Sequence, residues 1–215
     1  MIEVKNLSKK FKTTHGTLAV FDGFNLLVKD GTFLGIQGKS GAGKSTLLSL
    51  LAGLQKPDTG SITIDGTEIT ALDDKKLAAF RNRSIGFISQ EQSFLENLNV
   101  LDNVRLPAYL SKKHETDSEI SARAQKLLEE LGIAHLAAQY PADLSGGENH
   151  RILIARALIN APKIILADEP TDSVDSERTT AIITLFRQLA QTGKTVILVS
   201  HDEQALRLCD EVVEI

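Results

Sequence analysis

The sequence is poor in cysteine, methionine and tryptophan: it has one cysteine, one methionine and no tryptophan among 215 residues. A single cysteine cannot form an internal disulfide, which excludes a disulfide-stabilised scaffold, and we expect Cys209 to lie in the core. No apolar run approaches the roughly 20 residues that span a bilayer, and residues 1–5 lack the apolar segment of a signal peptide. The net charge of −4 provides no basic excess for nucleic acid. We therefore expect a cytoplasmic protein that binds no nucleic acid and reaches a membrane only through another protein.

The composition is that of an ordinary globular protein, with 42% hydrophobic and 24% charged residues. Residues 1–30 are β-rich, and residues 62–69 predict a hairpin that turns at Asp65-Gly66. Apolar strands follow at residues 85–88, 163–167 and 195–199, with helical segments between them. This alternation predicts an α/β fold with a mainly parallel sheet covered on both faces.

The middle of the chain has a different character. Apolar residues recur at helical spacing from Ile120 to Leu131, and Gly132 follows as a helix C-cap. Residues 111–118 are polar and predict an exposed loop. We expect a helical subdomain inserted at about residues 91–160 into a single domain that spans residues 1–215.

A glycine-rich segment between an apolar strand (residues 33–36) and a helical run (residues 47–52) has the pattern of a phosphate-binding loop. It consists of Gly38, Lys39, Ser40, Gly41, Ala42, Gly43, Lys44, Ser45 and Thr46. Backbone N–H groups of such a loop bind phosphate oxygens, and the helix N-terminus adds partial positive charge. Lys44 then reaches the β- and γ-phosphates and Ser45 binds Mg²⁺. The alternative is a connector that binds nothing, but the strand-to-helix context favours a nucleoside triphosphate.

Two predicted strands end in side chains that can complete such a site. Asp168 and Glu169 follow the strand at residues 163–167, at the edge where open α/β sheets bind ligands. We expect Asp168 to hold Mg²⁺ through water and Glu169 to polarise the attacking water. Alone, the two acids fit equally well as caps of the next segment. His201 follows the strand at residues 195–199 on the same edge, where it can contact the γ-phosphate and orient the water.

A second phosphate-binding element is predicted far from the first. Ser145, Gly146, Gly147 and Glu148 precede a helix, whose N-terminus can bind an anion. Alone, this pattern fits an N-cap and turn. Because one nucleotide on one subunit does not explain both elements, we expect the second element to cap a nucleotide bound by another copy.

Together these segments resemble the ATP-binding-cassette ATPases over essentially the whole chain. Residues 38–46 are similar to the Walker A loop, residues 164–169 to Walker B and residues 144–148 to the signature motif. Gln90 matches the Q-loop glutamine, and His201 matches the switch histidine. Asp175 is the last residue of a segment that is similar to the D-loop. Phe11 sits where the family stacks an aromatic ring on adenine, and core packing is an equal alternative for it.

The resemblance implies ATP and Mg²⁺ as cofactors, and a P-loop NTPase fold with an antiparallel β-subdomain beside the mainly parallel core sheet. The catalytic residues it implies are Lys44, Gln90, Glu169 and His201. The Mg²⁺ residues it implies are Ser45, Gln90 and Asp168. The ATP contacts it implies are Phe11, residues 38–46 and Asp175 of one subunit, and Ser145, Gly146, Gly147 and Glu148 of the other.

The resemblance also implies an ATPase motor that works as a head-to-tail dimer, with a second copy of itself or a paralogous cassette. A separate integral membrane subunit would hold it at the cytoplasmic face of the inner or plasma membrane. Residues 85–107 are similar to small bacterial cassettes of the LolD, MacB and FtsE types, which serve lipoprotein release, macrolide and peptide export, or cell division. The cargo is chosen by the membrane subunits, so these three remain open.

Several residues depart from the family pattern. Glu148 and His150 stand where glutamine is usual, while Lys39 and residues 172–174 differ from the subgroup. The main alternative is a soluble, non-transport cassette. The sequence argues against this alternative because it has no coiled-coil insert, no cysteine pair, no second cassette and no excess of basic residues. A nucleotide kinase or GTPase has no reason to carry residues 144–148. Because the sequence ends in an expected strand at residues 213–215, we expect no C-terminal regulatory domain.

Overall fold

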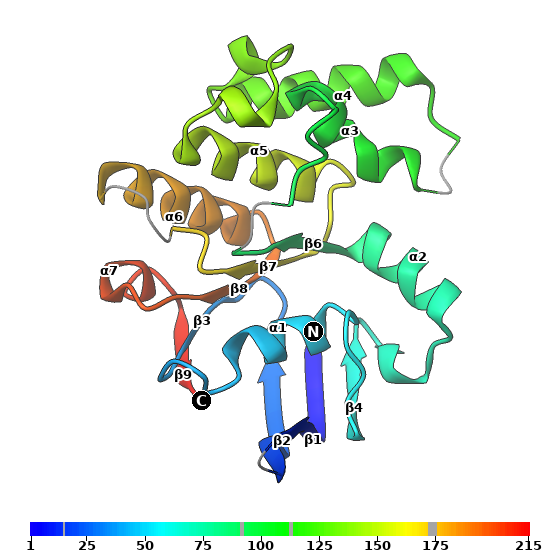
Figure 1. Ribbon diagram of the computed structural model, residues 1–215, viewed down its shortest axis with the longest axis vertical. Coiled ribbons are helices and arrows are strands. Elements are labelled where there is room, and N and C mark those ends of the chain that lie inside the picture. The colour runs from blue at the N-terminus through cyan, green and yellow to red at the C-terminus, as the bar shows by residue number, and fades with distance from the viewer. Residues whose placement is uncertain (15, 91–92, 112–113, 172–175) are drawn as a thin grey trace.

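The structure is a computed structural model that describes residues 1–14, 16–90, 93–111, 114–171 and 176–215. A five-stranded sheet lies between a layer of helices and a four-stranded antiparallel sheet (Figure 1). In chain order the elements are β1 (Ile2–Thr13), β2 (Gly16–Val28), β3 (Phe33–Gln37), α1 (Lys44–Leu51), β4 (Thr59–Ile64), β5 (Thr67–Glu68), α2 (Asp74–Ser84), β6 (Ile85–Ile88), α3 (Val100–Tyr109), α4 (Asp117–Glu130), α5 (Gly146–Leu158), β7 (Ile164–Asp168), α6 (Ser176–Gln191), β8 (Thr195–Val199), α7 (Glu203–Leu206) and β9 (Glu211–Glu214).

The central sheet has the order β6-β7-β8-β3-β9, and its neighbouring strands are parallel. Every residue of β7 and β8 is buried, as a strand covered on both faces requires. The pairing of Asp168 with Val199 brings the carboxyl ends of these two strands to one edge. The predicted mainly parallel, two-sided sheet is therefore confirmed.

Alternate residues of β7 face different cores, because successive side chains of a strand point to opposite faces. Ile164 and Leu166 pack in a cluster with α1 and the antiparallel sheet, whereas Ile165 and Ala167 pack with α5 and α6. Cys209 is half-buried against this second cluster, and burial raises the pKa of its thiol to about 12. Cys209 therefore lies at the edge of the core rather than deep within it.

The antiparallel sheet has the order β2-β1-β4-β5. The predicted hairpin forms, with Asp65 (φ 48°) and Gly66 (φ 73°) at the turn between β4 and β5. The predicted second strand is shorter than expected: Ile69 begins a single turn of 3₁₀ helix, Ile69–Ala71. The side chain of Ile69 is buried in the cluster formed with α1 and the antiparallel sheet, and β5 ends at Glu68.

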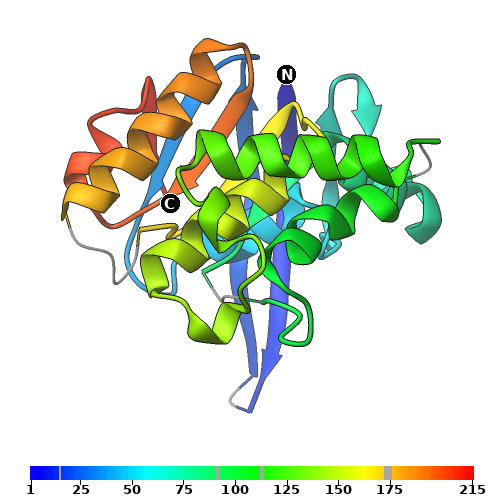
Figure 2. The ribbon, with the colours of Figure 1, turned by 90° about the horizontal axis from the view of Figure 1, so that it is seen from above.

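The helical layer has a hydrophobic cluster of its own, formed by α3, α4 and α5. These three helices lie together above the sheet (Figure 2). Helix α5 belongs to two clusters: Leu153 and Ile154 face the central sheet, while Ile152 and Ala155 face α3 and α4. The predicted amphipathic helix is α4, which ends before Gly132 (φ 70°).

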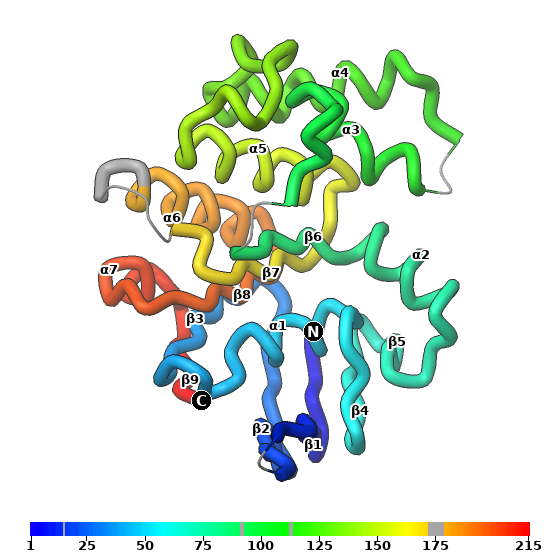
Figure 3. The backbone as a smooth tube through the Cα atoms, in the orientation of Figure 1, coloured from blue at the N-terminus to red at the C-terminus, as the bar shows by residue number. Residues whose placement is uncertain are grey.

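The backbone enters the helical layer after β6 and returns to the sheet through α5 (Figure 3). This path fits the predicted insertion at about residues 91–160, whose limits stay a prediction. Over the described parts of the chain, no helix combines the length and the apolar character that crossing a membrane would need.

Candidate active site

The glycine-rich loop connects β3 to α1, as its sequence predicts. Gly43 is the N-cap of α1 with φ 103°, and a Cβ atom there would lie 2.3 Å from Cγ1 of Val20. Only glycine meets both conditions. The ammonium group of Lys44 donates hydrogen bonds to the carbonyl oxygens of Gly38 (2.8 Å) and Lys39 (3.1 Å), so the loop is wound around this side chain. Lys44 is only 7% exposed.

An open groove of about 450 Å³ lies over this loop and the carboxyl edge of the central sheet. It brings together residues that sequence reasoning assigned separately. Its lining includes Phe11, Ser40, Gly41, Gly43, Lys44, Ser45, Thr46, Gln90, Glu169 and His201. Asp175, the predicted D-loop contact, lies outside the described residues.

Asp168 and Ser45 lie together beneath this groove. Burial raises the pKa of Asp168, while a hydrogen bond from Ser45 and the charge of Lys44 act in the opposite direction. The Oδ1 atom of Asp168 is buried and has no hydrogen-bond partner. Because an unpaired buried carboxylate oxygen is costly and oxygen ligands suit hard cations, this pair fits Mg²⁺.

Glu169 has the left-handed backbone conformation (φ 46°), unusual for a residue with a side chain. Its N–H donates to the carbonyl oxygen of Val199 at 3.0 Å. The backbone N–H of His201 donates to Oε2 of Glu169 at 3.2 Å. Burial raises the pKa of Glu169, and His201 opposes that shift. A carboxylate with a raised pKa is a better proton acceptor.

Phe11 lines the groove and is partly buried. The ammonium group of Lys9 lies 5.4 Å from the centre of its ring. Phe11 belongs to none of the three hydrophobic clusters formed by the described residues. This placement favours adenine stacking over core packing for Phe11, which stays a prediction.

The signature segment lies elsewhere. Ser145 is the exposed N-cap of α5 and forms a capping box with Glu148. None of residues 144–148 is among the described residues that line the groove over the loop. Within one copy of the chain, the signature segment therefore does not line the groove over the glycine-rich loop, and its binding of phosphate stays a prediction.

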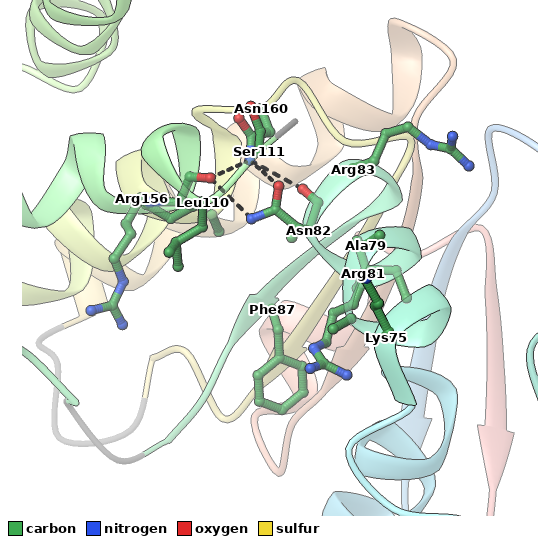
Figure 4. Close-up of a pocket in the computed structure, with 15 residues that line it drawn as sticks. Lys75, Ala79, Arg81, Asn82, Arg83, Phe87, Leu110, Ser111, Arg156 and Asn160 are labelled. Carbon is green, nitrogen blue, oxygen red and sulfur yellow. Dashed lines mark hydrogen bonds between the residues drawn. The ribbon is translucent and has the colours of Figure 1, made fainter. Parts of the chain in front are cut away.

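Sequence reasoning missed a second, larger groove of about 750 Å³ between α2, β6, α3 and α5. In Figure 4, Asn82 and Asn160 lie side by side, linked by hydrogen bonds. Nδ2 of Asn82 and Nδ2 of Asn160 also donate to the carbonyl oxygen of Pro107, at 2.9 and 3.1 Å. Among the residues that the structure describes, the basic ones that line this groove are Lys75, Arg81, Arg83 and Arg156. Three of them lie in α2, and this concentration of basic residues was the sequence signal that could have indicated the groove.

The comparison with known families decides the assignment. The sequence pattern of the ABC transporter family matches residues 21–172. The chain belongs to this family. The cassette is 40% identical to the lipoprotein-releasing system ATP-binding protein LolD of Bacteroides fragilis, over 99% of this chain and 96% of that protein. It is 38% identical to the uncharacterised ABC transporter ATP-binding protein YknY of Bacillus subtilis, over 99% of this chain and 92% of that protein.

Solved structures agree with this assignment. The cassette matches MJ0796, described as an ATP-binding cassette dimer in a post-hydrolysis state bound to ADP and phosphate, with a TM-score of 0.94. The two are 36% identical over 100% of this chain and 94% of that one. The P-loop NTPase fold and the identification as an ABC-type ATPase are therefore confirmed.

Proposed function

We propose that the cassette is the ATP-hydrolysing motor subunit of a membrane complex, in which head-to-tail dimerisation driven by ATP moves a membrane-spanning partner. The observation that carries this proposal is the separation of the groove over Lys44 from the signature segment at Ser145. Two copies arranged head to tail would close each groove with the other copy's helix N-terminus. The structure of the relative MJ0796 is described as dimeric, which supports this arrangement.

Within one groove, the loop N–H groups and Lys44 would bind the phosphates of ATP. Ser45 and Asp168, with Gln90, would hold Mg²⁺, which would neutralise charge on the β- and γ-phosphates. Phe11 would stack on the adenine. These roles follow from where the side chains lie around the groove, and from the unpaired oxygen of Asp168.

Glu169 would accept the proton of the attacking water, and His201 beside it would hold that water in line with the γ-phosphate. Ser145, Gly146 and Gly147 of the second copy would donate hydrogen bonds to the γ-phosphate from the N-terminus of α5. Hydrolysis would remove the group that joins the two copies, and the dimer would open.

The membrane-spanning partner would dock in the groove between α2 and α3, at the junction of the central sheet and the helical layer. This groove combines an apolar floor at Ile85 and Phe87 with basic side chains at its sides. The bonds among Asn82, Pro107 and Asn160 tie α2 to α3 and to the end of α5. Movement of the helical layer would therefore reach a partner held there. Through this partner the cassette would lie at the cytoplasmic face of the inner or plasma membrane.

The test is to purify tagged Glu169→Gln protein with ATP from source cells and to identify what co-purifies from membrane and soluble fractions. We expect an integral membrane protein to co-purify. It should still be captured by a Lys126→Glu variant, whose changed residue is exposed on α4 and is not among the groove's lining residues, and it should be lost from an Arg81→Glu, Arg83→Glu double variant. The topology of the captured subunit would separate export, lipoprotein release and force transmission. Capture of a soluble assembly or of nucleic acid would overturn the motor assignment and favour a non-transport cassette.

A further inference from the structure

We infer that Glu148 occupies the phosphate site of its own signature helix in the isolated subunit, and that nucleotide on the second copy must displace it. Glu148 thereby weakens the ATP-dependent dimer. This inference rests on the proposed head-to-tail dimer and adds a residue that sets its affinity.

The hydrogen bonds in the first turn of α5 are the starting point of this inference. The Oε2 atom of Glu148 accepts a hydrogen bond from the hydroxyl of Ser145 at 2.6 Å and another from the N–H of Ser145 at 2.8 Å. The N–H of Glu148 donates back to the Ser145 hydroxyl oxygen at 3.4 Å. A single carboxylate oxygen thus takes both donors of Ser145.

These are donors that an incoming phosphate would use. The N-terminus of a helix binds an anion through its free N–H groups and its partial positive charge. Ser145 and Gly146 are exposed, so another molecule can reach this end of α5. A phosphate arriving there meets a carboxylate already in place, and the two negative charges repel. Glu148 must therefore swing away, which breaks the two charge-assisted hydrogen bonds that Oε2 accepts.

Glutamine at position 148 would remove the negative charge of Glu148 and keep the N-terminus of α5 capped. Its carbonyl oxygen can accept the same bonds, since glutamine serves in capping boxes as glutamate does. Bonds to a neutral acceptor are weaker than bonds to a carboxylate, so they yield more easily to phosphate. The repulsion would also disappear. Glu148→Gln should therefore strengthen association while α5 stays capped.

Helix α4 supplies a matched control. Thr116 caps it with the same box, in which Oε2 of Glu119 accepts from the N–H and the hydroxyl of Thr116, both at 2.8 Å. This box has the same chemistry as that of α5 but lies outside the proposed nucleotide interface. Glu119→Gln measures what the change of cap does by itself.

The experiment titrates dimer formation in saturating ATP and Mg²⁺ by analytical ultracentrifugation, in a Glu169→Gln background that does not consume nucleotide. Removing the repulsion between one carboxylate and the phosphate should strengthen binding about threefold at each of two equivalent sites, as expected for like charges in water. We expect Glu148→Gln to lower the dimer dissociation constant about tenfold, and Glu119→Gln to leave it unchanged. An unchanged or weaker Glu148→Gln dimer, in a background that does dimerise, would overturn this inference alone. A background that stays monomeric with ATP would overturn the proposed function and this inference with it.

Discussion

The Nε2 atom of His201 lies 3.3 Å from the Oε1 atom of Glu169. The parallel pairing of β7 with β8 brings the two residues to one edge of the sheet, and the left-handed backbone of Glu169 turns its carboxylate toward the histidine. The carboxylate is mostly buried while His201 is more than half exposed at the groove. This geometry suits a proton acceptor whose neighbour faces the substrate.

Replacing Glu169 by glutamine should lower ATP hydrolysis by about 10²–10⁴-fold, as loss of a general base does. ATP binding should survive, because glutamine keeps the shape and removes only the ability to accept a proton. Phosphate release and nucleotide binding would be measured side by side, with the exposed Glu211→Gln as control. Near-normal turnover in Glu169→Gln would remove Glu169 from its proposed role.

Asp168→Asn should stabilise the nucleotide-free protein at neutral pH. Burial raises the folded-state pKa of Asp168, so its contribution to stability is present below the unfolded pKa and is lost as the pH rises through the folded pKa. Once the pH exceeds this raised pKa, the carboxylate is charged and its buried Oδ1 atom is unpaired, which costs about 1–3 kcal/mol.

The measurement for Asp168→Asn is thermal unfolding without nucleotide or Mg²⁺ across the acid-to-neutral range. The melting temperature should rise by a few degrees at pH 7, and the gain should shrink as falling pH protonates Asp168 in the parent protein. The exposed Asp22→Asn should show no such trend. A lower melting temperature for Asp168→Asn at pH 7 would contradict the interpretation.

Ser145→Arg should abolish hydrolysis and leave ATP binding to the single subunit intact. The bulky cation would block the exposed N-terminus of α5, which faces the second copy's nucleotide in the proposed dimer. Nucleotide affinity would be measured by equilibrium titration at protein concentrations where the chain is monomeric. If binding itself collapses, the signature acts within one chain and the head-to-tail arrangement fails.

Phe11→Ala should weaken ATP binding by about 1–3 kcal/mol, the range for loss of one stacked base. Because Phe11 is only partly buried and lies outside the hydrophobic clusters of the described residues, its loss should change the melting temperature little. Measuring both ATP affinity and melting temperature distinguishes adenine stacking from core packing of Phe11. A large drop in melting temperature with unchanged affinity would favour core packing.

Much of the fold could be predicted because its signals are local. The buried strands β7 and β8 are continuous apolar runs, and the turn at Asp65-Gly66 has residues suited to positive φ. Local signals failed at Ile69, which the pattern assigned to a strand and which begins a 3₁₀ turn. The components of the nucleotide groove were predicted too, since parallel strands deliver their carboxyl ends to one edge.

Other features depend on contacts that no local pattern contains. The groove joined by Asn82 and Asn160 combines the consecutive elements α2 and β6 with α3 and α5, which come later in the chain. The left-handed backbone of Glu169 is set by its bonds to Val199 and His201, on the neighbouring strand and just beyond it. The hydrogen bonds from Ser145 to Glu148 follow a known capping pattern, but their conflict with phosphate appears only once the exposed helix end is in view.

The central claim is that ATP joins two copies of this cassette and that hydrolysis separates them. The most direct test is the mass of Glu169→Gln protein in solution with Mg²⁺ and either ATP or ADP, measured by light scattering after size exclusion. We expect a dimer with ATP, a monomer with ADP, and a monomer with ATP when Ser145→Arg is added. A monomer in ATP, under conditions where bound nucleotide is detected, would contradict the account.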